Sequence, residues 1–149
     1  MTGFKMNARR DVVVVGGGQA GIAAARLLAY MGLSFVVLDA GGDIGESRRR
    51  RYNGLALFTP RAYSGLPDMA MSGDPTGYPV ETNLPPISKP TQTIFVFRSS
   101  TDHAFGSRTR NEEGEFLLRG NGFGPLRADA VIVAAGAFRD PVVPSWVSR

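Results

Sequence analysis

The residues with the clearest chemical meaning are the glycines of GGGQAG, residues 16–21, which follow DVVVV and precede the apolar segment GIAAARLLAYM. In the GxGxxG spacing of Gly16, Gly18 and Gly21, the first glycine permits a tight turn and the second lets the backbone approach a pyrophosphate. The third lets helix and strand pack closely. A pyrophosphate would lie at the helix N-terminus, where unpaired N–H groups face it. We therefore predict a phosphate-binding loop with backbone contacts from Gly16, Gly18, Gln19, Ala20 and Gly21.

An acidic residue follows at the position that this kind of site requires. The segment SFVVLDA, residues 34–40, has the composition of a second buried strand, and it ends in Asp39 and Ala40. The Asp39 carboxylate would accept hydrogen bonds from an adenosine ribose. An acid rather than a base argues against a 2′-phosphate, so FAD or NAD fits this position better than NADP. The alternative, an accidental glycine-rich turn, is less favoured because strand, glycines, helix, strand and acid occur in the expected order.

The elements that must position these residues form a βαβ unit over residues 10–40. Residues 11–15 are a β-branched run without alternation, which is typical of a strand buried on both faces of a parallel sheet. The helix that follows should end at Gly32. The predicted fold class is therefore α/β, a Rossmann-like FAD/NAD(P)-binding domain with a parallel sheet.

Composition narrows the function classes further. A chain of 149 residues with 43% hydrophobic and 20% charged residues indicates one domain, residues 1–149. The absence of cysteine excludes disulfides, thiolate nucleophiles and cysteine-based metal sites, and His103 is the single histidine. Without a signal-peptide pattern or a long apolar run, we expect a cytoplasmic protein with no membrane partner.

Basic residues account for the net charge of +4, and four arginines are consecutive at residues 48–51. Such a run is more often a solvated face than a ligand clamp. It lacks the interleaved aromatic residues of a single-strand binding surface, so no nucleic-acid partner is expected.

Several ordered motifs resemble one family. They are GGGQAG, DIGESRRRRY, LFTPRAYSGLP, GDPTGYP and ADAVIVAAGAFRDPVVP. Together they cover most of residues 10–79 and 112–145, and this set is similar to the N-terminal FAD-binding part of the flavin-containing monooxygenase-like proteins, the bacterial flavoproteins grouped with class B monooxygenases. Two positions depart from the family pattern: Arg48 replaces a usual Trp, and Ala135 replaces a usual Thr.

The resemblance implies that the βαβ unit binds the ADP half of FAD. It also implies that Glu46, Ser47 and Arg48 lie along the flavin and that Ala135 and Gly136 close over the cofactor. In this family NADPH reduces the flavin, which then activates oxygen. Family members continue with a second nucleotide fingerprint for NADPH, and this sequence contains no second GxGxxG, so we expect a truncated member without the NADPH site.

The family pattern fails over residues 81–110. Family members have an amphipathic helix there, but Pro85, Pro86 and Pro90 would break a helix. Because the spacing between GYP and GEF matches that of the family, we hypothesise a coding-frame slip that later corrects itself. Ordinary divergence is the alternative, and a stop codon in the shifted frame would contradict the slip. We predict an aberrant, poorly structured segment, with His103 an incidental loop residue.

Residues 112–140 should return to the sheet. Glu115 to Arg119 has a strand pattern, GNGFG indicates a turn, and ADAVIVAAG indicates a buried strand ending at Gly136. This gives the domain a small β-rich excursion.

Three functions follow as hypotheses. The first is the FAD-binding N-terminal portion of a flavin-dependent, NAD(P)H-linked oxidoreductase resembling monooxygenases and not competent alone. The alternatives are a non-catalytic dinucleotide-binding module and an inactive remnant. No catalytic residue and no metal site is assigned. Apolar surface left without its partner should promote self-association.

Overall fold

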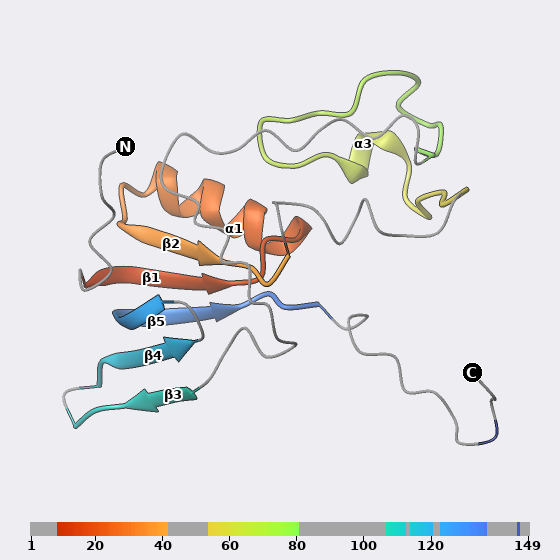
Figure 1. Ribbon diagram of the computed structural model, residues 1–149. Coiled ribbons are helices and arrows are strands. Elements are labelled where there is room, and N and C mark those ends of the chain that lie inside the picture. The colour runs from red at the N-terminus through yellow and green to blue at the C-terminus, as the bar shows by residue number, and fades with distance from the viewer. Residues whose placement is uncertain are drawn as a thin grey trace.

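The computed structural model describes residues 9–41, 54–80, 107–112, 114–120, 123–136 and 146. Two helices and five strands lie in these ranges (Figure 1). In chain order they are β1 (Arg10–Val15), α1 (Gln19–Tyr30), β2 (Phe35–Leu38), α3 (Arg61–Ser64), β3 (Ser107–Arg110), β4 (Phe116–Gly120) and β5 (Phe123–Val133). The strands form one mixed sheet in the order β2-β1-β5-β4-β3.

The parallel half of the sheet contains the predicted βαβ unit. Strand β1 pairs in parallel with β2, with Val12 opposite Phe35 and Val15 opposite Leu38. On its other side β1 pairs in parallel with β5, and Val15 is opposite Val133. All four residues of β2 are buried, as is usual for strands of a parallel sheet. The predicted α/β, Rossmann-like fold class is confirmed.

An antiparallel meander forms the other half. Strand β3 pairs with β4, and β4 pairs with the first part of β5, where Leu118 is opposite Leu126. Ala128 pairs with Phe116 of β4 and with Arg10 of β1, so one long strand joins the two halves of the sheet. The β-rich excursion predicted from the sequence corresponds to this meander.

Helix α1 covers one face of the parallel strands. Its Ala25 and Leu28 pack on Val12 and Val14 of β1, together with Phe35 and Val37 of β2. Gly32 lies just beyond the helix with φ +70°, and its N–H donates to the Ala29 carbonyl at 3.1 Å, which is the predicted helix stop.

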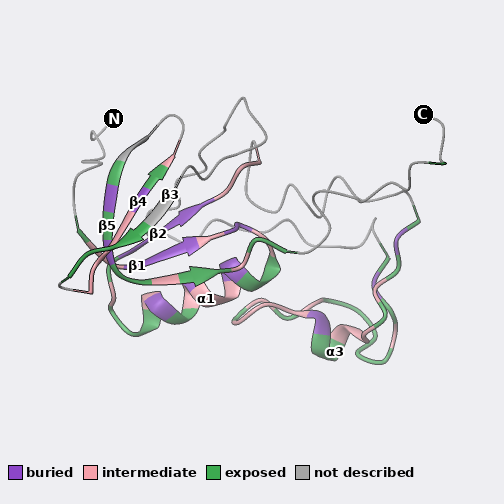
Figure 2. Ribbon diagram, turned by 90° about the horizontal axis from the view of Figure 1, so that it is seen from below, coloured by how far each residue is buried: buried purple, intermediate pink, exposed green. Residues whose placement is uncertain are grey.

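The meander covers the opposite face of β1 and β2. A second cluster on this face consists of Val13, Val36, Leu38, Leu118, Leu126 and Ala128. In Figure 2 the parallel strands lie between α1 and the meander. The domain therefore buries both faces of β1 and β2, as the unbroken apolar run of each strand requires.

Three expectations for the second half of the chain need correction. Strand β5 begins at Phe123, inside the predicted GNGFG turn, because residues 123–128 pair with β4. Its end is not buried: Ile132 is 36% and Val133 is 66% exposed. The segment 81–110, expected to be poorly structured, lies outside the described residues up to 106, and residues 107–110 form β3 instead.

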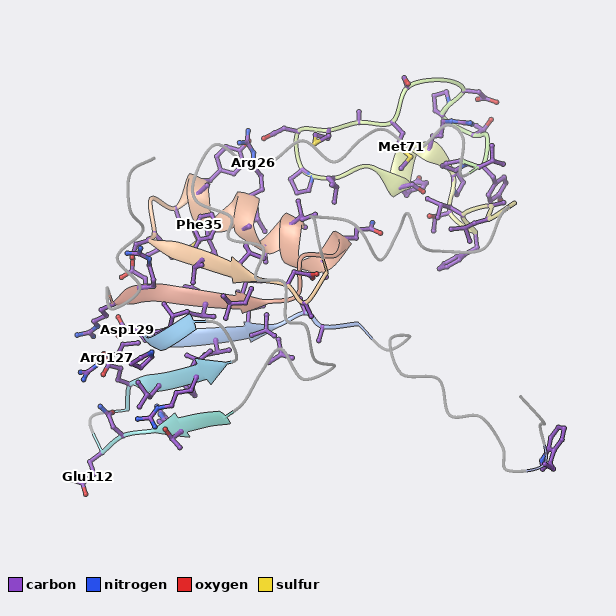
Figure 3. The ribbon with its side chains drawn as sticks, in the orientation of Figure 1. Arg26, Phe35, Met71, Glu112, Arg127 and Asp129 are labelled. Carbon is purple, nitrogen blue, oxygen red and sulfur yellow. The ribbon has the colours of Figure 1, made fainter. Side chains whose placement is uncertain are left out.

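Residues 54–80 form a separate excursion above α1 (Figure 1). Leu66 and Met69 exchange backbone hydrogen bonds across a turn in which Asp68 has φ +59°. The Asp68 carboxylate binds Arg26 of α1, at 2.8 Å from Nε and 2.7 Å from NH2. Arg26 projects away from the sheet, whereas Phe35 lies between the sheet and α1 (Figure 3). None of the helices described is long and apolar enough to cross a membrane.

Candidate dinucleotide-binding site

The glycine loop lies where the carboxyl ends of β1, β2 and β5 meet. The Gly16 N–H donates to the Leu38 carbonyl at 2.7 Å, and the Ala134 N–H donates to the Val15 carbonyl at 2.7 Å. These two bonds bring the loop between β1 and α1 next to the residues that follow β2 and β5. In open α/β sheets this end of the strands is where ligands bind.

Gly16 is constrained by both its conformation and its neighbours. Its φ is +112°, a conformation that L side chains rarely adopt, which fits the tight turn expected of the first glycine. A Cβ atom at this position would also lie 2.2 Å from the Ala134 carbonyl oxygen. The close approach of the chain after β5 therefore requires a glycine here, which the motif alone does not reveal.

Gly21 allows α1 to approach the loop closely. A Cβ atom on Gly21 would lie 1.8 Å from the Gly16 carbonyl oxygen and 3.4 Å from Cγ1 of Val14. The role expected for the third glycine, close packing of helix and strand, fits these distances.

The N-terminus of α1 is open to an anion. Gly18 is the N-cap residue, with an extended backbone at φ −77° and ψ −170°, and it provides no side-chain cap. Its carbonyl accepts the Ile22 N–H at 3.0 Å, so the preceding amides at the helix start have no partner within the helix. The first turn contains no acidic residue. Gln19 and Ala20 are exposed there, and the positive end of the helix dipole faces away from the core.

Asp39 is held against the glycine loop by two backbone amides. Its Oδ2 accepts the Gly17 N–H at 2.5 Å, and its Oδ1 accepts the Gly41 N–H at 2.7 Å. Each carboxylate oxygen has two lone pairs, so each retains acceptor capacity for a ligand hydroxyl. The carboxylate is therefore both fixed in position and chemically available.

Gly17 is a site residue that the spacing argument missed. A Cβ atom on Gly17 would lie 3.1 Å from the Asp39 Cβ and 3.2 Å from its Oδ2. A larger residue would press on the carboxylate that the loop binds. The available signal was the run of three glycines, which contains one more glycine than GxGxxG requires.

The structure describes only some of the remaining predicted site residues. Ala40 is half-buried beside Asp39, while Ala135 and Gly136 are exposed beyond the end of β5, Gly136 with φ +74°. These residues follow the carboxyl ends of β2 and β5, which are parallel to β1 and lie at the end of the sheet where the glycine loop begins (Figure 1). Glu46, Ser47 and Arg48 lie outside the described residues. Within the described ranges, no three His, Cys, Asp or Glu residues are placed to hold a metal ion.

Comparison with known proteins agrees with the Rossmann-like fold. Residues 14–65 match the NAD(P)-binding Rossmann-like domain. An uncharacterized oxidoreductase CzcO-like protein of Geobacillus kaustophilus is 34% identical over 148 aligned positions, covering 91% of this chain and 38% of that protein. The indole-3-pyruvate monooxygenase YUCCA1 of Oryza sativa is 28% identical over 145 positions, covering 90% of this chain and 34% of that protein.

A solved structure shares the fold. The flavin-containing monooxygenase from Stenotrophomonas maltophilia superposes with a TM-score of 0.69 at 28% sequence identity, covering 92% of this chain and 41% of that chain. The chain thus spans only 34% to 41% of the length of these three proteins. Over that part, the chain is similar to flavin-containing monooxygenase-like oxidoreductases, as the motifs in the sequence predict.

Proposed function

We propose that the chain is the FAD-binding portion of a flavin-dependent, NAD(P)H-linked oxidoreductase of the monooxygenase type. The observation that supports this most directly is the position of Asp39, whose carboxylate is bound to the Gly17 amide beside the uncapped N-terminus of α1. An acceptor for a ribose and donors for a pyrophosphate are thus adjacent, as an adenine dinucleotide requires.

Each group of residues has one role in this proposal. The amides of Gly18, Gln19 and Ala20 bind the pyrophosphate, and Asp39 accepts hydrogen bonds from the adenosine ribose. Ala135 and Gly136 line the site from the end of β5, and Glu46, Ser47 and Arg48 contact the flavin ring. A bound FAD supplies the redox chemistry, whereas the protein supplies binding and orientation. The Asp39 charge repels a 2′-phosphate, so NADPH, the reductant expected for the family, does not bind at this position.

A second candidate is a dinucleotide-binding module without catalysis. It is supported by the described site itself, in which every group that faces the proposed ligand serves binding. Retention of FAD without NADPH oxidation would favour this module, and retention of FAD with NADPH oxidation would favour the oxidoreductase.

The test is retention of flavin by the purified chain. Excess FAD is added, unbound cofactor is removed, and visible absorbance and flavin fluorescence are recorded for the parent and for Gly18→Asp. Aspartate is a favourable N-cap residue, so this variant should keep α1 intact while placing a negative charge against the pyrophosphate. The control Leu27→Asp adds the same charge to an exposed position, 54% exposed, on α1.

We expect the parent and Leu27→Asp to retain flavin and Gly18→Asp to lose it. A parent that retains no flavin, with the circular dichroism of a folded α/β domain, would contradict the proposal. Equal retention by all three proteins would place the cofactor elsewhere.

A further inference from the structure

We draw no further inference here: the strongest candidate, the turn of residues 65–69 in the excursion above α1, whose Asp68 carboxylate binds Arg26 of the helix, depends for its link to the proposed cofactor site on residues 42–53, a segment that lies outside the described residues.

Discussion

The Asp39 carboxylate accepts a hydrogen bond from the Gly17 amide at 2.5 Å, which joins the end of β2 to the loop that begins α1. One residue thus orders the glycine loop, and in the proposed function the same carboxylate accepts hydrogen bonds from a ribose. Changes at either residue should therefore affect cofactor binding more than stability.

Asp39→Asn should weaken FAD binding at least about tenfold, which is about 1.4 kcal/mol. The amide side chain has only one acceptor oxygen, so it cannot accept both the Gly17 and the Gly41 N–H groups while also binding a ribose. Fluorescence titration with FAD measures the effect. Asp74→Asn is the matched control, because Asp74 accepts two hydrogen bonds from Thr76 within its own loop. Equal dissociation constants for the two variants would contradict the assigned role.

Alanine at Gly17 and at Gly21 should have different effects. At Gly21 the new Cβ meets a backbone oxygen that cannot move, so we expect a loss in the free energy of unfolding at the upper end of about 1–3 kcal/mol. At Gly17 it meets the Asp39 side chain, which can shift, so stability should fall by less than about 1 kcal/mol while FAD affinity falls. Urea unfolding and FAD titration of both variants test this order. A Gly21→Ala variant that is more stable than Gly17→Ala would refute it.

The turn at Asp68 should tolerate glycine better than alanine. Both lose the ion pair with Arg26, which is worth at most about 1 kcal/mol because the two side chains are 39% and 49% exposed. Alanine must also adopt the left-handed conformation, φ +59°, at a cost of roughly 1–2 kcal/mol, whereas glycine adopts it freely. In thermal unfolding, the melting temperature of Asp68→Gly should therefore be close to that of the parent. Both should be higher than the melting temperature of Asp68→Ala. The opposite ranking of the two variants would show that the turn is not formed.

Stability should depend on pH through Asp11. Hydrogen bonds from the Ser34 hydroxyl and backbone amide to Oδ2, at 2.7 and 2.6 Å, hold the pKa of Asp11 below its usual value of 3.8. Because the folded-state pKa is the lower one, the stabilisation is present above about pH 4 and is lost as the pH falls through the folded-state pKa. Asp11→Asn should lower the melting temperature at pH 7, and the difference from the parent should shrink below about pH 4. A difference independent of pH would contradict this assignment.

Local sequence predicted the first 40 residues well. The apolar runs predicted the bounds of β1 and β2 to within a residue or two, and Gly32 predicted the end of α1. These predictions succeeded because hydrophobic patterns and turn residues act over short distances in the sequence. Strand β4 was also predicted from its own composition. Gly17 was missed because its constraint comes from Asp39, a neighbour in space that no spacing rule includes.

The errors share one cause, which is long-range pairing. Residues 107–110 form a strand because β4 lies beside them, and β5 starts early for the same reason. Ile132 has the composition of a buried strand residue but is exposed, since α1 covers β1 and β2 and does not extend over β5. Val133, on the opposite face, is exposed at the last residue of β5.

By itself, the sequence determined the βαβ unit, the glycine loop and the acid at Asp39, because glycine conformation, β-branched runs and helix ends are local properties. Only the tertiary structure decided that Gly16 is packed against Ala134, that Asp39 binds the Gly17 amide, and that the end of β5 is exposed. These features depend on which distant segments meet, and the free energy of such contacts is set by burial and backbone pairing across the whole sheet.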